Sequence, residues 1–170
     1  MKPGFILLLA LWLTPVWAQE IPKPAGIVNL DGRAAPALKL SDMDGKTTDL
    51  KQLRGRWVLV HFWASWCGPC RREMPTLQAL HDQLAGQPFA LVLVNTAETD
   101  DEVFSFMPTV APELSTLMDR DGLATQRWQP RGLPSTFIVD PAGRLRYLAL
   151  GGRNWASPAY VSFLKSLATP

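Results

Sequence analysis

Two cysteines, separated only by glycine and proline, are the residues whose type and spacing most clearly point to chemistry. Cys67 and Cys70 are the only cysteines among the 170 residues. Two thiols allow at most one intrachain bridge, which excludes a scaffold held together by several disulfides. They also exclude a zinc site built from two cysteine pairs. A Cys-x-x-Cys pair can instead exchange a disulfide with another molecule.

The position of this pair favours redox chemistry. Residues 57–64 form a nearly continuous apolar, β-rich run that predicts a buried central strand, and helical spacing follows from Met74. Cys67 therefore lies where a strand gives way to a helix, whose N-terminal dipole lowers a thiol pKa below about 8.5. We expect Cys67 to attack a partner disulfide and Cys70, one turn further in, to resolve the mixed disulfide. Pro69 suits the first helical turn.

An inert bridge and a metal site are the alternative interpretations. A disulfide that closes so short a loop restricts the unfolded chain very little, so it adds little stability. A metal needs further ligands, and His61 and His81 are the only histidines. We therefore predict a redox-active Cys67–Cys70 disulfide with no cofactor and no metal.

The first 18 residues predict an export signal. Lys2 precedes the apolar run 5–13, and Val16 and Ala18 occupy the −3 and −1 positions of a small-residue cleavage site. The apolar run is short for a span of about 30 Å. We predict a cleaved signal peptide and a soluble periplasmic protein, and the alternative is an uncleaved anchor in the inner membrane, facing the periplasm.

The remaining pattern predicts one domain preceded by a leader. Residues 19–34 are expected to be an extended leader, and residues 35–170 the domain. A hairpin is predicted around Asp44-Gly45, and strand, helix and strand over 57–95 predict a βαβ unit. Further helices are predicted at 100–106, 122–128 and 159–167, and further strands at 114–118, 135–140 and 145–150, the first of these bounded by Pro108 and Pro112.

Two segments carry a resemblance to thioredoxins. The run from Val60 to Cys70 looks like their active-site strand and helix start, and 131–137 looks like their cis-proline segment. The hairpin at 35–46, an extra segment of about 25 residues after the second core strand, and 134–140 resemble the periplasmic TlpA/ResA/DsbE-like branch. The resemblance implies an α/β thioredoxin fold: a central mixed sheet flanked by helices, with an N-terminal β-hairpin and a central insertion.

The resemblance also implies roles for individual residues. Pro134 is expected to carry a cis peptide bond facing the cysteines, and Leu133 to touch the partner. Glu73 shares the helix face of Cys70 and matches an acidic group that tunes the thiols. The alternative for Glu73 is a solvated residue paired with a neighbouring arginine.

His61 departs from the thioredoxin pattern, which has aspartate there. We interpret it as a hydrogen-bonded core imidazole, with a proton relay to Cys70 as the alternative. Trp66 is expected at the surface, where it forms the substrate-binding surface together with Leu133, Gly68 and Pro69.

The predicted function is an exported thiol-disulfide oxidoreductase that reduces partner disulfides. The Gly-Pro dipeptide matches reducing thioredoxins, and the resemblance implies a membrane thiol transporter of the DsbD/CcdA type as electron donor. Expected targets are apocytochrome c cysteines, as in cytochrome c maturation, a copper-delivery protein or another oxidoreductase. A periplasmic dithiol oxidant or isomerase and a non-enzymatic copper carrier are the alternatives.

Two further classes are excluded by the residues. A peroxidase is not expected because the Thr-x-x-Cys pattern is absent before Cys67. The net charge of +2, from 17 basic and 15 acidic residues, argues against nucleic-acid binding through a basic face. We expect a monomer whose partners are proteins.

Overall fold

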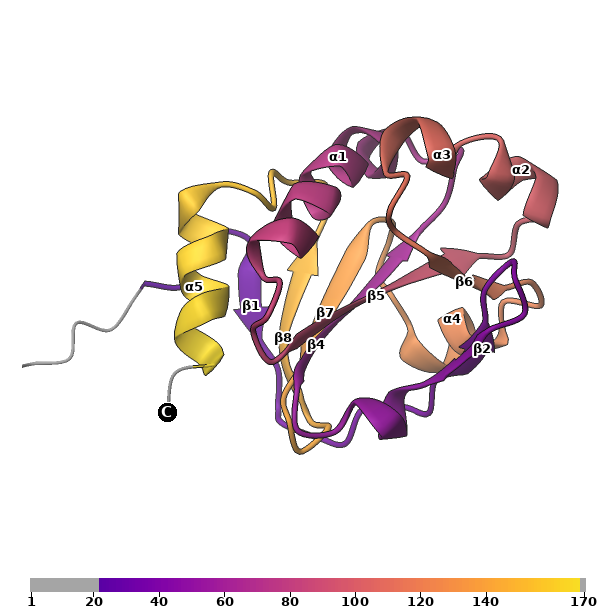
Figure 1. The fold of residues 1–170 in the computed structure, drawn as a ribbon. Coiled ribbons are helices and arrows are strands. Elements are labelled where there is room, and N and C mark those ends of the chain that lie inside the picture. The colour runs from indigo at the N-terminus through magenta and orange to yellow at the C-terminus, as the bar shows by residue number, and fades with distance from the viewer. Residues whose placement is uncertain (1–21, 169–170) are drawn as a thin grey trace, which may run out of the picture.

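The computed structural model describes residues 22–168 (Figure 1). The predicted signal peptide, 1–18, lies outside the described residues. Within residues 22–168, no helix has the length and apolar character needed to cross a bilayer. The strands are β1 Ile27–Asn29, β2 Lys39–Ser41, β3 Thr47–Asp49, β4 Trp57–Trp63, β5 Phe89–Thr96, β6 Thr116–Asp119, β7 Ser135–Val139 and β8 Leu145–Leu150. The helices are the 3-10 helix η1 Leu50–Leu53 and α1 Gly68–Gln83, α2 Asp100–Phe104, α3 Met107–Val110, α4 Leu123–Trp128 and α5 Pro158–Ala168.

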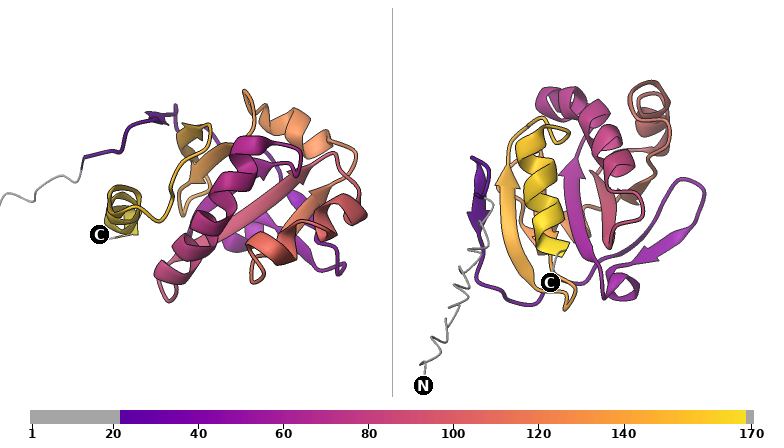
Figure 2. Two further views of the ribbon diagram at one scale, coloured as in Figure 1. Left: turned by 90° about the horizontal axis from the view of Figure 1, so that it is seen from above. Right: turned by 60° about the vertical axis from the view of Figure 1, so that its left-hand side comes forward.

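Six strands form the central sheet, in the order β1-β8-β7-β4-β5-β6. β4 pairs in parallel with β5 and antiparallel with β7, and β5 pairs in parallel with β6. The sheet is therefore mixed, and β4-α1-β5 is the predicted βαβ unit. β2 and β3 form the predicted hairpin as a separate two-stranded sheet. The hairpin extends beside β6 (Figures 1 and 2), where an isolated bridge joins Asp42 to Leu117.

Helices cover both faces of the sheet, which is why β4 is apolar at every position except His61. Leu59 and Trp63 belong to the hydrophobic core beneath α1, α3 and α5, and Figure 2 shows α1 and α5 over the same face. Val60 and Phe62 belong to the core on the opposite face, which α4 covers. Because side chains alternate along a strand, His61 faces the same side as Leu59 and Trp63. The strand therefore directs His61 beneath α1.

Three elements differ from the sequence prediction, and one of them is the short 3-10 helix η1, which was not predicted. Residues 19–34 were expected only as an extended leader, but 27–29 form β1 and pair with β8 at the edge of the sheet. So short a strand has no recognisable period, and its partner lies far away in the sequence. The short helix α3 was not predicted, and Pro108 was expected to bound a strand. Pro108 instead lies in the first turn of α3, where its missing N–H costs no hydrogen bond.

Candidate active site

The two cysteines lie at the junction of β4 and α1, where the sequence predicted them. They form a disulfide with their Cα atoms 5.2 Å apart. Cys67 is the N-cap of α1, and its Sγ accepts the Cys70 backbone N–H at 3.3 Å. Cys67 is 5% exposed, whereas Cys70 is 0% exposed. A reagent can therefore approach Cys67 first, and its sulfur already accepts an N–H bond that would stabilise a thiolate.

The segment before β7 lies at the same end of the sheet. Phe62, next to the end of β4, pairs with Ser135 at the start of β7, so residues 133 and 134 adjoin the β4–α1 junction. The Leu133–Pro134 peptide bond is cis, as the resemblance implied. The Pro134 carbonyl accepts the Gly151 N–H at 2.9 Å, which ties this segment to the end of β8. Leu133 is partly buried and packs against both hydrophobic cores.

Gly152 closely approaches the turn between the cysteines. A Cβ at Gly152 would lie 3.1 Å from the Pro69 Cβ and 3.2 Å from the Pro69 carbonyl oxygen. A side chain there would push on backbone that cannot easily move, because Pro69 lies in the first turn of α1. The loop after β8 therefore supports the turn that holds the disulfide, a contact that no local sequence pattern indicates.

Glu73 is buried rather than solvated, so the pairing with a neighbouring arginine is wrong. Its side chain is 2% exposed. Its Oε2 accepts the Arg153 backbone N–H and the Trp155 indole N–H, each at 3.1 Å. Burial disfavours the charged form and raises the pKa of Glu73 to about 7, although these two hydrogen bonds and the charge of Arg153 act in the opposite direction. Glu73 can therefore take up or release a proton near neutral pH.

His61 lies directly against Glu73. Its Nε2 is 3.3 Å from Oε1 of Glu73, and its Nδ1 is 2.8 Å from Oγ1 of Thr136 on β7. The imidazole is 0% exposed, and burial, with a smaller effect from the charge of Arg153, lowers the pKa of His61 to about 3. His61 is therefore a neutral imidazole at physiological pH and is hydrogen-bonded in the core, as predicted.

Two tryptophans beside the cysteines have opposite environments. Trp66 is 70% exposed, which places an apolar ring at the surface next to Cys67, as expected. Trp63 is fully buried, and its indole N–H donates to Thr116 Oγ1 at 2.9 Å. A third tryptophan, Trp155, donates its indole N–H to Glu73. No local pattern reveals that contact, because Trp155 follows Glu73 by 82 residues.

A buried carboxylate holds the segment that precedes Cys67. Glu98 accepts the Ser65 backbone N–H at 2.7 Å and the Ser65 hydroxyl at 2.5 Å, and it accepts the Asn95 side-chain amide at 2.6 Å. Arg71 donates to the Ser65 carbonyl at 3.2 Å and lies 4.5 Å above the Phe106 ring. These contacts hold Ser65 in place, two residues before Cys67 at the start of α1. They also direct Arg71 toward Ser65 and Phe106.

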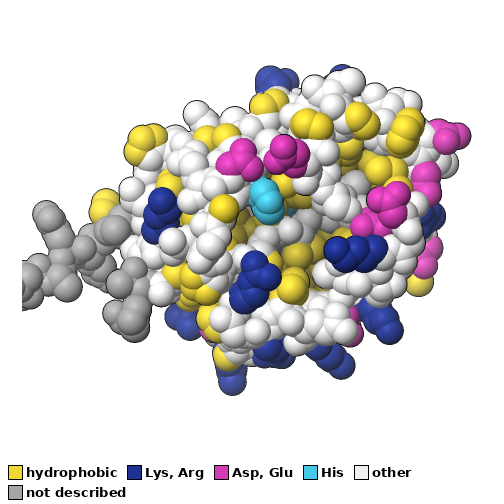
Figure 3. All heavy atoms as spheres, in the orientation of Figure 1, with side chains coloured by type: hydrophobic (Ala, Val, Ile, Leu, Met, Phe, Trp, Pro, Cys, Tyr) yellow, Lys and Arg dark blue, Asp and Glu magenta, His cyan; other side chains and the backbone are white. Residues whose placement is uncertain are grey.

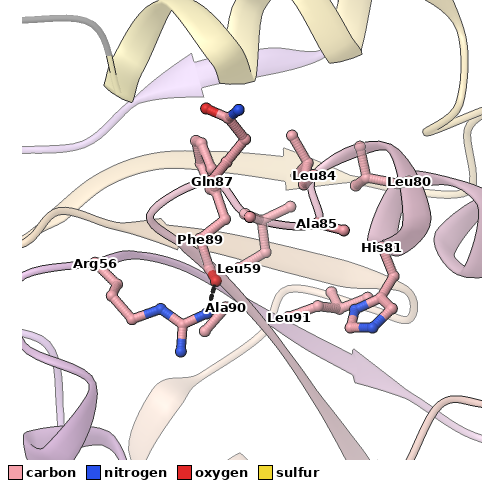
Figure 4. A pocket seen from close by; sticks show the side chains of 11 residues that line it. Arg56, Leu59, Leu80, His81, Leu84, Ala85, Gln87, Phe89, Ala90 and Leu91 are labelled. Atoms are coloured by element: carbon pink, nitrogen blue, oxygen red, sulfur yellow. Dashed lines mark hydrogen bonds between the residues drawn. The ribbon is translucent and has the colours of Figure 1, made fainter.

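The two ends of α1 adjoin different pockets. At the cysteine end, a pocket of about 490 Å³, here called the Glu73 pocket, is lined by Pro69, Arg72, Glu73, Thr76, Gly152, Arg153 and Asn154. At the far end, a pocket of about 360 Å³ is mainly apolar, and Figure 4 shows Leu59, Leu80, Leu84 and Leu91 around it. Arg56 borders it and donates to the Phe89 carbonyl. Figure 3 shows this face hollowed over β5, with hydrophobic side chains visible.

Comparison with known proteins places this geometry in a family. The AhpC/TSA family model matches residues 32–148. Thiol-disulfide oxidoreductase ResA of Bacillus subtilis (strain 168) is 30% identical over 121 residues, which cover 71% of this chain and 68% of that protein. ResA of Geobacillus thermodenitrificans (strain NG80-2) is 31% identical over 120 residues, with 71% and 69% covered.

Solved structures agree with this assignment. A Chlorobium tepidum protein described as a thiol:disulfide interchange protein DsbE has a TM-score of 0.69 and 28% identity, over 80% of this chain and 93% of that one. A second thioredoxin-family protein, from Chlorobium tepidum TLS, has a TM-score of 0.71 over 84% of this chain and 100% of that one, and at 23% identity it supports the fold alone. The chain therefore belongs to the AhpC/TSA family of thioredoxin-like proteins and is a thiol-disulfide oxidoreductase.

Proposed function

We propose that this protein is an exported oxidoreductase that reduces disulfides of partner proteins through Cys67. One observation supports the proposal above all others: Cys67, the N-cap of α1, keeps a small exposed fraction of 5%, whereas Cys70 is completely buried. This arrangement separates the sulfur that meets the partner from the sulfur that releases it. The proposal starts from the reduced protein, in which the Cys67 thiol has released its proton to solvent and Cys70 carries a thiol.

The exchange has two steps. The Cys67 thiolate attacks one sulfur of the partner disulfide, forms a mixed disulfide and expels the other partner sulfur as a thiolate, which takes a proton from water. The Cys70 thiol then loses its proton, and its thiolate attacks the Cys67 sulfur. This step forms the Cys67–Cys70 disulfide and releases the second partner sulfur as a thiolate. Two electrons pass from the protein to the partner.

Glu73 is proposed to accept the proton of Cys70. It lies three residues after Cys70, so the two side chains share a face of α1. A general base is most effective when its pKa lies near the working pH, and burial raises the pKa of Glu73 to about 7. The Glu73 pocket adjoins the carboxyl group and offers the proton a way to solvent.

The partner is proposed to dock on an apolar surface around Cys67. Trp66 supplies an exposed ring and Leu133 a partly buried side chain beside the cis bond. Gly68 and Pro69 form the turn between the cysteines, where backbone can approach the partner closely. Contact with this small surface, rather than long-range charge, selects the partner, since the net charge of the chain is only +2.

The proposed direction and location of the reaction are supported by two sequence features, the Gly-Pro dipeptide and the predicted export signal. The Gly-Pro dipeptide matches reducing thioredoxins, whose potential is about −270 mV. A reductant in the oxidising periplasm needs electrons, so we assign the donor role to a membrane thiol transporter of the DsbD/CcdA type. The proposed substrates are disulfides of apocytochrome c, of a copper-delivery protein or of another oxidoreductase. The protein is proposed to act as a periplasmic monomer.

The reduction potential of the Cys67–Cys70 pair against glutathione tests the direction. A value below about −230 mV is expected, and a value near −120 mV, typical of a strong oxidant, would contradict a reducing role. Trapping tests the chemistry itself. Cys70→Ala should accumulate mixed disulfides through Cys67 in cells, and the matched control Cys67→Ala should trap nothing. The absence of adducts with Cys70→Ala would refute an exchange function and leave thiolate copper binding as the alternative.

A further inference from the structure

A row of polar groups crosses the interior from β7 through β4 to α1. The Thr136 hydroxyl contacts Nδ1 of His61 at 2.8 Å, and Nε2 of His61 faces Oε1 of Glu73 at 3.3 Å. All three residues are buried. Among the described residues, Nε2 of His61 and Oε1 of Glu73 are buried atoms without a hydrogen-bond partner, so they lie close together but are not aligned as a hydrogen bond in this structure. Two acceptors at this distance repel each other, so one proton must lie between them.

The proton can belong to either residue, because Thr136 can respond. When Glu73 is ionised, His61 carries its proton on Nε2 and donates to Oε1, and Nδ1 accepts from the Thr136 hydroxyl. When Glu73 is protonated, its O–H donates to Nε2, and His61 carries its proton on Nδ1 and donates to Thr136. A hydroxyl serves equally as donor and acceptor. Both contacts in the row therefore pair a donor with an acceptor in either state.

We propose that His61 and Thr136 form a positioning pair that allows buried Glu73 to gain and lose a proton by reversing the tautomer of the imidazole. The proposal rests on the role of Glu73 as the acceptor of the Cys70 proton. It assigns Thr136 a part in the reaction that its sequence position did not suggest. The imidazole stays neutral throughout, so it acts through Glu73 and needs no contact with the partner.

The other hydrogen-bond partners of Glu73 are donors only, so the change of tautomer in the His61–Thr136 pair is what can respond to the ionisation of Glu73. From the loop before α5, the Arg153 backbone N–H and the Trp155 indole N–H donate to Oε2. The Arg153 guanidinium donates to Tyr160 and to the Leu150 and Gly151 carbonyls. From α1, Cys70 lies one turn away, and Arg72 lines the Glu73 pocket. The two donors on Oε2 only donate, so Oε1 is the atom at which the proton can be exchanged.

An aspartate at position 61 could not replace His61 in this role. Two buried carboxyl groups in contact would disfavour each other's ionised form, and one of them would have to stay protonated. An apolar residue would leave Oε1 without a donor when Glu73 is ionised. The neutral imidazole avoids both problems, which gives a physical reason for the departure from the thioredoxin pattern at this position.

Carbon-13 NMR of labelled Glu73 carboxyl groups in the oxidised protein tests the proposal, because it reports the pKa of Glu73 without reference to activity. His61→Leu removes the donor to ionised Glu73, so its pKa should rise by about one pH unit or more. Thr136→Val leaves Nδ1 without a partner. A buried N–H without an acceptor is tolerated worse than an unpaired acceptor, so the Nε2–H tautomer is favoured and the pKa of Glu73 should fall.

Two further variants complete the test. His61→Gln carries an amide that reaches Oε1 as donor or acceptor, so it should bring the pKa of Glu73 back toward that of the unmodified protein. Thr116→Val is the matched control, since it also removes a buried hydroxyl, at a site bonded to Trp63, and should leave the pKa of Glu73 unchanged.

Shifts of the same sign in His61→Leu and Thr136→Val, or no shift in either, would overturn the proposal. Failure of the exchange function would be seen separately. Cys70→Ala would then form no mixed disulfides, whereas the pKa of Glu73 would still shift in opposite directions in His61→Leu and Thr136→Val.

Discussion

The substitution Glu73→Gln should make the oxidised protein more stable at alkaline pH. Burial raises the pKa of Glu73 from 4.5 to about 7. The folded state therefore holds this proton more tightly than the unfolded chain does. The resulting stabilisation is fully present below about pH 4.5 and is lost as the pH rises to about 7. At 1.36 kcal/mol per pH unit, the lost stability amounts to about 3 kcal/mol.

Glutamine resembles the protonated form of Glu73, so the variant should keep that stability at all pH values. Its carbonyl oxygen can still accept from the Arg153 backbone N–H and the Trp155 indole N–H, and its amide can donate to Nε2 of His61. We expect nearly equal free energies of unfolding for the variant and the unmodified protein near pH 4. At pH 8 the variant should be more stable by up to about 3 kcal/mol.

Urea unfolding of the oxidised protein, followed by tryptophan fluorescence from pH 4 to pH 8.5, measures this difference. Glu113→Gln is the matched control, because it makes the same change of charge at an exposed position and should keep the pH dependence of the unmodified protein. The reasoning would be refuted if Glu73→Gln were no more stable than the unmodified protein at pH 8. It would also be refuted if the decline in stability between pH 4.5 and pH 7 persisted in the variant.

Three further substitutions probe the site and its support. Trp66→Ala should lower kcat/KM for a protein disulfide without changing Tm, because the ring is 70% exposed; unchanged kinetics would remove Trp66 from the docking surface. Gly152→Ala should slow exchange with a small disulfide reagent while leaving Tm nearly unchanged, because the new Cβ presses on Pro69; an unaltered rate would show that the turn between the cysteines accommodates the Cβ. Asp119→Ala should cost about 2–4 kcal/mol in urea unfolding, since Asp119 accepts the Ala124 and Thr125 N–H groups and the Thr125 hydroxyl at the start of α4, and a loss below about 0.5 kcal/mol would contradict that capping role.

Most of the fold could be predicted from local patterns. The apolar run at 57–64 became β4 because helices cover both faces of the sheet, and the alternation around Asp44-Gly45 became the β2–β3 hairpin. The segments that escaped prediction were short. β1 has three residues and α3 has four, so neither shows a recognisable period, and each depends on packing against distant parts of the chain.

Some features of the site could likewise be predicted from local patterns, and others could not. Sequence alone determined the cysteine pair, its place at a strand-to-helix junction and the shared helix face of Cys70 and Glu73, because these depend on spacing within a few residues. Only the tertiary structure decided that Glu73 is buried, that Trp155 donates to it and that His61, which is hydrogen-bonded to Thr136 on β7, contacts it from β4. These contacts join residues up to 82 positions apart. Their effect on the pKa of Glu73 arises from exclusion of water, which no local spacing reveals.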